Sequence, residues 1–186
     1  MVSLAVRTTI FLVVTTIFII ISRRSLCNPK AHGFYRFFAF EGIAILVLYN
    51  NPLWFNDPFS FRQCLSWLLL LLSIALVVRG VDLLKRIGGH SQRSNCPENL
   101  PFENTQNLVQ HGLYSYIRHP MYTSLLLLAW GAFLKRVDGV TIVAVVVVSL
   151  ALFCTAKVEE QENFKFFGAD YLDYCTRSKM FIPFIF

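Results

Sequence analysis

Residues 121–158 read MYTSLLLLAWGAFLKRVDGVTIVAVVVVSLALFCTAKV, in which two apolar runs, 121–134 and 140–158, are separated by only five residues, 135–139. So short a connection forces two consecutive helices to lie antiparallel as a hairpin. The segment before the first helix and the segment after the second therefore emerge at the same end of the pair. The residues on both sides of this hairpin are the most unusual ones in the chain.

Three further apolar runs, 4–21, 37–49 and 64–84, precede the hairpin. Hydrophobic residues make up 55% of the 186 residues, whereas soluble domains contain about 45–50%, and so small a chain has too little interior to bury the excess. A helix needs roughly 20 residues to cross a bilayer core. The sequence therefore predicts an all-α integral membrane protein with about five transmembrane helices. Runs 37–49 and 121–134 are short, so a tilted span, a re-entrant segment or half of a tight hairpin stays open for each.

Basic residues flank the apolar runs unequally. If all five runs cross, twelve Lys and Arg residues fall on one side and four on the other, with Arg79 inside the third run. Loops rich in Lys and Arg stay in the cytoplasm, so we expect the N-terminus outside and the C-terminus in the cytoplasm. Arg23 and Arg24 follow the first run, which favours a retained anchor over a signal peptide. The charges are spread over three membrane-flanking segments, so a nucleic-acid partner is not expected.

A polar stretch, 88–110, carries Gly88, Gly89 and two prolines and is typical of a loop. We expect N-terminal membrane helices with their loop in 1–105, and a single C-terminal unit built on the hairpin in 106–186. The five cysteines form no C-x-x-C pair, and no His/Cys cluster has the spacing of a zinc site. Neither a disulfide framework nor a metal site is therefore expected.

The segment before the hairpin, 112–122, reads GLYSYIRHPMY. Pro120 is favoured at the first position of a helix, so Arg118 and His119 lie at a helix N-terminus. Free backbone N–H groups and the helix dipole attract an anion there, and Arg118 adds a permanent positive charge. Nearby tyrosines offer flat faces for a heterocycle or a cationic sulfonium. The alternative is an ordinary membrane-interface anchor, since Arg, His and Tyr all favour that depth.

The segment after the hairpin carries three carboxylates, Glu159, Glu160 and Glu162. Acidic groups near a helix C-terminus oppose its dipole unless a cation compensates them; a ligand ammonium and Arg118 are the two candidates. We interpret Glu159, nearest the membrane, as functional and Glu162 as part of a solvated polar helix. Gly168 then predicts a helix stop, followed by a short amphipathic helix with two tyrosines. The tail, 180–186, is predicted to lie along the interface as a lid or anchor.

The chain resembles the isoprenylcysteine carboxyl methyltransferase family, to which phospholipid methyltransferases are related. The resemblance covers about residues 106–183 and is carried by Gly112-x-Tyr114-x-x-Ile117-Arg118-His119-Pro120-x-Tyr122, Glu159-Glu160, Phe167-Gly168-x-x-Tyr171-x-x-Tyr174 and Pro183. It implies an integral-membrane methyltransferase without a Rossmann domain, whose S-adenosylmethionine lies in a cytoplasmic pocket formed by the hairpin and tail.

The resemblance also implies a set of site residues. The cofactor would contact Gln106, Asn107, Leu108, Val109, Tyr114, His119, Pro120, Met121, Tyr122 and Glu159, the last at its ammonium group. Arg118 and Glu160 would be catalytic, with Glu160 the nearest base if the nucleophile is an amine. A lipid or prenylated substrate would enter from the bilayer. The reaction implied first is carboxyl methylation of an isoprenylcysteine, and the alternative is N-methylation of a phospholipid or other lipid.

One departure from the family concerns the substrate. An arginine four residues before the cofactor glutamate is associated with substrate binding in the isoprenylcysteine enzymes, and Thr155 occupies that position here. Two alternative hypotheses for the function also remain open. Membrane sterol reductases share an Arg-His-Pro-x-Tyr element and use NADPH, although they are usually much longer, and a non-enzymatic membrane subunit would keep only the scaffold.

Overall fold

The computed structural model describes residues 3–89 and 105–185. Within these ranges the protein is all-helical, and its β-structure is limited to an isolated bridge between Ile117 and Lys179. The elements are α1 Leu4–Leu26, α2 His32–Asn50, η1 Asn51–Leu53, α3 Phe61–Ile87, η2 Gly112–Ser115, α4 Pro120–Phe133, α5 Gly139–Phe167 and α6 Ala169–Arg177. The fold class predicted from the sequence is confirmed.

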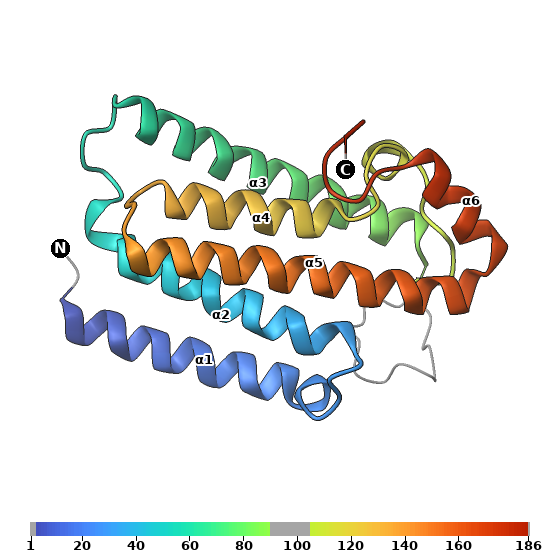
Figure 1. The fold of residues 1–186 in the computed structure, drawn as a ribbon, viewed down its shortest axis with the longest axis horizontal. Coiled ribbons are helices and arrows are strands. Elements are labelled where there is room, and N and C mark those ends of the chain that lie inside the picture. The colour runs from blue at the N-terminus through green and yellow to red at the C-terminus, as the bar shows by residue number, and fades with distance from the viewer. Residues whose placement is uncertain (1–2, 90–104, 186) are drawn as a thin grey trace.

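Five of the helices form a bundle (Figure 1). Helix α1 packs on α2, α2 on α5, α5 on α4, and α4 on α3, while the short α6 lies across one end. The core between them holds fully buried aliphatic side chains such as Leu46, Val148 and Leu152. Outward-facing residues of the same helices are apolar too, for example Leu12, Leu71 and Val143, which are 60–63% exposed. Exposed apolar surface of this extent is what a lipid environment requires.

Three helices, α1, α3 and α5, are long and apolar enough to cross a membrane, and α4 is a shorter apolar helix. The chain is therefore an integral membrane protein. All five predicted apolar runs lie in helices. Helix α2 begins at His32, five residues earlier than the run 37–49 indicated, because polar residues such as His32 and Arg36 are buried there instead of ending the helix.

The hairpin turn between α4 and α5 is fixed by a reciprocal cap. The Asp138 carboxylate accepts a hydrogen bond from the Thr141 backbone N–H at 3.0 Å, and the Thr141 hydroxyl oxygen accepts one from the Asp138 N–H at 3.0 Å. Such a capping box satisfies two otherwise unpaired donors at a helix start. At the other end, Gly168 has φ 61° and closes α5, as its position in the sequence predicted.

The C-terminal tail packs beside the segment that precedes α4. The backbone N–H of Arg118 donates to Lys179 O at 2.7 Å, that of His119 to Met180 O at 3.2 Å, and that of Lys179 to Tyr116 O at 3.0 Å. Met180 and Phe181 are buried in the core behind this pairing, whereas Phe184 and Ile185 are exposed. The tail thus holds the start of α4 in place and is not merely an interfacial anchor.

Candidate functional site

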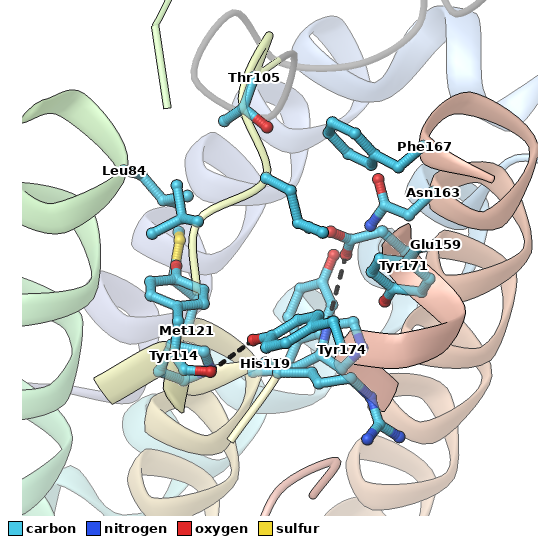
Figure 2. A pocket seen from close by; sticks show the side chains of 15 residues that line it. Leu84, Thr105, Tyr114, His119, Met121, Glu159, Asn163, Phe167, Tyr171 and Tyr174 are labelled. Atoms are coloured by element: carbon cyan, nitrogen blue, oxygen red, sulfur yellow. Dashed lines mark hydrogen bonds and ion pairs between the residues drawn. The ribbon is translucent and has the colours of Figure 1, made fainter. Parts of the chain in front are cut away.

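A cavity opens at the end of the bundle where α3 and α5 end and α4 begins (Figure 2). Its walls come from six segments: the end of α3, the strip before η2, η2 itself, the start of α4 with the two residues before it, the last turns of α5, and α6. The lining residues are Leu84, Thr105, Leu108, Val109, Tyr114, Arg118, His119, Pro120, Met121, Tyr122, Glu159, Asn163, Phe167, Tyr171 and Tyr174. The hairpin thus brings the segments on either side of it to one site.

His119 is the N-cap residue of α4 and is only 5% exposed. Its ring stacks on Tyr122, with centroids 5.4 Å apart and an interplanar angle of 17°. Nδ1 lies 3.8 Å from Glu159 Oε2, and Nε2 lies 3.6 Å from Glu160 Oε1. Nε2 makes no hydrogen bond within the described part of the chain. A buried polar atom without a hydrogen bond is costly, and the Glu160 carboxylate 3.6 Å away offsets that cost only in part.

The Arg118 side chain, which lines the cavity, binds groups from three other segments of the chain. Its Nε donates to Glu160 Oε1 at 2.7 Å, and Nη1 donates to Ser178 O at 2.5 Å and to Cys175 O at 3.3 Å. The side chains of Arg118 and Glu160 are 12% and 15% exposed. Charge-assisted bonds at this burial are stronger than those between neutral groups. They join α5, α6 and the tail to the start of α4.

The two carboxylates that follow each other on α5 face different spaces. Glu159 lines the cavity, whereas Glu160 lines a neighbouring groove between α5 and α6. Its second oxygen, Oε2, lies 3.6 Å from Lys157 Nζ. Tyr171 borders both spaces.

Three tyrosines give the cavity an aromatic wall. Burial raises the pKa of Tyr114, Tyr171 and Tyr174, and the negative charge of Glu159 adds to the effect at Tyr114 and Tyr171. Their hydroxyls therefore stay protonated even at pH values where an exposed tyrosine ionises. The Tyr174 hydroxyl donates to Tyr114 O at 2.6 Å (Figure 2). This bond holds α6 against η2 and keeps both rings at the cavity.

Most of the residues singled out from the sequence meet here, but three do not line the cavity. Tyr114, Arg118, His119, Pro120, Met121, Tyr122, Glu159, Leu108 and Val109 lie in its wall. The backbone N–H groups of Gln106 and Asn107 instead donate to Gly88 O, at 2.8 and 3.0 Å. Gln106 and Asn107 thus fasten the strip to the end of α3, and Glu160 lines the adjacent groove.

The sequence reading did not assign several lining residues. Asn163 and Phe167 follow Glu159 at i+4 and i+8 on α5, so helical spacing was a signal for both, and Phe167 also belongs to the motif Phe167-Gly168. Leu84 and Thr105 carried no such signal. Glu162 was interpreted as solvated, yet its carboxylate lies 2.8 Å from His32 Nδ1 at the start of α2. That contact joins residues 130 positions apart, which no local pattern reveals.

Fold and site together define an all-helical membrane protein with a tyrosine-lined cavity, which Arg118, His119 and Glu159 also line, at one end of its bundle. A family model described as phospholipid methyltransferase matches residues 61–170. The chain therefore belongs to the phospholipid methyltransferase family, and the resemblance stated above is confirmed.

Curated relatives agree with this assignment. The chain is 33% identical over 86 residues to protein-S-isoprenylcysteine O-methyltransferase A of Arabidopsis thaliana, covering 45% of this chain and 43% of the relative. It is 33% identical over 84 residues to protein-S-isoprenylcysteine O-methyltransferase of Saccharomyces cerevisiae, covering 45% and 35%. The chain thus spans less than half the length of these relatives. No solved structure matches it significantly.

Proposed function

We propose that this protein is an S-adenosylmethionine-dependent methyltransferase that acts on a membrane-embedded substrate. The observation that carries the proposal is the meeting of His119, at the start of α4, with Glu159, near the end of α5, at 3.8 Å in one cavity. A helix N-terminus attracts an anion, and a carboxylate attracts a cation. Side by side they suit a zwitterionic amino acid, which is the chemistry of one end of this cofactor.

The residues present fit such a ligand in further respects. Glu159 would hold the ammonium group, the start of α4 would hold the carboxylate, and His119 Nε2 is a buried atom without a hydrogen bond among the described residues. Aromatic faces of Tyr114, Tyr171 and Tyr174 suit a heterocycle or a cationic sulfonium. When bound, the cofactor supplies a methyl group activated by a positive sulfur. The protein's share is then to orient the acceptor and to exclude water.

For the acceptor we propose first the carboxylate of a prenylated cysteine, the substrate class named for the relatives. A carboxylate is already ionised and needs no base. Arg118 would lie beside it, and apolar substrate would reach the site from the bilayer. The excess of basic residues at this end of the bundle supports a cytoplasmic site.

A second acceptor class, an amine-bearing lipid, is favoured by Thr155. This residue is fully buried, and its hydroxyl donates to Ala151 O at 2.7 Å, so it offers nothing to a substrate carboxylate. An amine must lose a proton before it attacks. Glu160, at the groove beside the cavity, would accept that proton.

Binding of S-adenosylhomocysteine to the purified protein in nanodiscs tests the proposal. We expect Glu159→Ala and His119→Ala each to weaken binding at least about tenfold, or roughly 1.4 kcal/mol. Asp173→Ala, on the exposed side of α6, is the matched control and should bind as the wild type does. Failure of the wild type to bind would overturn the proposal.

A transfer assay distinguishes the acceptors. Labelled S-adenosylmethionine is offered with a prenylcysteine analogue in one arm and with an aminophospholipid in the other, and the product is identified by mass spectrometry. Labelling in neither arm, with cofactor binding intact, would contradict both acceptor classes.

A further inference from the structure

The last turns of α5, which carry Glu159, have little apolar burial to hold them. After Ala156 no residue of α5 is fully buried, and Gln161, Phe164, Lys165 and Phe166 are exposed. Helical stability in proteins comes mainly from packing of an apolar face. Polar links must therefore determine where this part of α5 lies relative to the cavity.

One such link is the contact of Arg118 with Glu160 described above, and another comes from α2. Glu162 Oε2 lies 2.8 Å from His32 Nδ1, and Glu162 Oε1 accepts a hydrogen bond from the His32 backbone N–H at 3.3 Å. The His32 side chain is 2% exposed and that of Glu162 is 18% exposed. Both oxygens of the carboxylate are thus bound by one residue.

The start of α2 gains from the same contact. Ala31, the N-cap residue of α2, has no side chain that can accept a hydrogen bond. The first amides of a helix have no partner within it. The carboxylate of Glu162 takes the place of a cap for one of them, from a helix far away in the sequence. Removing Glu162 takes away the carboxylate that binds both the buried His32 ring and the His32 backbone N–H.

The contact of His32 with Glu162 lies close to Glu159, the carboxylate proposed to bind the cofactor. Glu162 is three residues after Glu159, so the two share one side of α5. His32 and Arg36 lie one helical turn apart on α2 and both are buried, and the permanent positive charge of Arg36 attracts the Glu159 carboxylate. Neither His32 nor Glu162 lines the cavity, and α2 lies outside the segment matched by the family model.

We propose that His32 and Glu162 are positioning residues, which hold the end of α5 so that Glu159, Asn163 and Phe167 face the cofactor. The proposal rests on the proposed function. Helix α2 would then support the cofactor site indirectly, since no residue of α2 lines the cavity. Loss of the link would let the end of α5 turn or fray, and would act on the cofactor and not on the lipid substrate.

The experiment compares variants of the full chain in nanodiscs by calorimetric binding of S-adenosylhomocysteine. We expect His32→Ala and Glu162→Ala to weaken binding about fivefold or more, and the double variant to be no worse than either, because both act through one contact. His32→Asn keeps an N–H donor close to the position of Nδ1, so its affinity for S-adenosylhomocysteine should lie within about twofold of the wild-type value. In the transfer assay the KM for the cofactor should rise, while the KM for the lipid stays unchanged.

Asn50→Ala is the control for a general loosening of α2. Asn50 is fully buried at the opposite end of α2, and its Nδ2 donates to Ala132 O at 2.8 Å. This variant should lower the melting temperature without changing cofactor affinity. Hydrogen exchange provides a second readout: in His32→Ala, amides of 159–167 should exchange faster while those of 145–156 do not.

The outcomes separate this inference from the function on which it rests. A wild type that does not bind S-adenosylhomocysteine overturns the proposed function, and the inference with it. A wild type that binds, with His32→Ala binding equally well, overturns the inference alone. Asn50→Ala weakening the affinity as much as His32→Ala would also overturn it, because the effect would then be one of stability.

Discussion

Arg118 and Glu160, 42 positions apart in the chain, form a 2.7 Å hydrogen bond between Nε and Oε1, and the same guanidinium binds the Ser178 carbonyl. One side chain therefore connects the start of α4 with α5 and with the C-terminal tail. The pair lies between the cavity that Glu159 lines and the groove that Glu160 lines. If the pair serves structure alone, changing Arg118 or Glu160 should affect stability; if Glu160 also takes part in the chemistry, changing it should affect the reaction rate.

Glu160→Gln should separate these roles. The amide keeps an oxygen that accepts from Arg118, so the melting temperature and cofactor affinity should stay close to those of the wild type. If Glu160 accepts a proton from an amine, kcat for the aminophospholipid should fall at least about tenfold, which corresponds to roughly 1.4 kcal/mol. Arg118→Ala should instead lower stability by about 1.5–3 kcal/mol, measured by thermal unfolding. Full aminophospholipid activity in Glu160→Gln would contradict a base at this position.

The buried tyrosines make stability depend on alkaline pH. An unfolded tyrosine ionises near pH 10, whereas burial raises the pKa of Tyr171 and Tyr174 in the folded protein. Above pH 10 the unfolded chain therefore releases protons first, and stability falls as the pH rises. Melting temperatures at pH 9, 10 and 11 should fall less steeply for Tyr171→Phe than for the wild type. Tyr116→Phe, which removes an exposed hydroxyl, should follow the wild type.

Lys135, in the turn between α4 and α5, is fully buried at the other end of the bundle. Its Nζ donates to Gln63 Oε1 at 2.9 Å and lies 3.7 Å from the centre of the Trp67 ring. Burial lowers the pKa of Lys135 from 10.5 to about 8. Between these values the unfolded chain holds a proton that the folded chain has lost, so stability rises with pH across that window.

Lys135→Met, which keeps an unbranched apolar side chain without the charge, tests this pH dependence. The melting temperature of the wild type relative to the variant should increase between pH 7.5 and 10. An equal difference at all pH values would show that Lys135 does not change its protonation in that range.

Gly42 lies where α2 packs tightly against α5. A Cβ added at Gly42 would overlap with Cγ2 of Val148, a fully buried core residue. Overpacking of this kind costs about 1–3 kcal/mol, and each kcal/mol shifts the melting temperature of a chain of this size by roughly 2–4 °C. Gly42→Ala should therefore be less stable, and Val148→Ala in the same chain should recover part of the loss.

Gly139→Ala provides the matched control for this substitution. No atom lies within 4 Å of a Cβ added at Gly139, so this variant should melt close to the wild type. Equal melting temperatures for the two glycine variants would contradict a tight crossing at Gly42.

Much of the helical layout was predictable because its signals are local. Apolar runs give the helices, Pro120 begins α4, Gly168 ends α5, and the five residues 135–139 force the hairpin. Since the hairpin must bring its two flanks together, the meeting of His119 with Glu159 was predictable as well. The described structure agrees with each of these expectations.

The details of the site depended on contacts that no local pattern encodes. Gln106 and Asn107 belong to the same strip as Leu108 and Val109, yet their amides bind the end of α3 and only the latter two line the cavity. The tail residues pair with the backbone before α4, because Met180 and Phe181 find a place in the core.

Amino-acid order alone determined that the protein is a helical membrane protein, where its hairpin turns, and which residues gather at one end of it. These features follow from hydrophobic burial and capping, which act over a few residues. Only the tertiary structure decided that α2 begins at His32, that His32 binds Glu162, and that Glu160 faces a different space from Glu159. Such contacts depend on how whole helices pack, and a difference of one turn in that packing would give each side chain another partner.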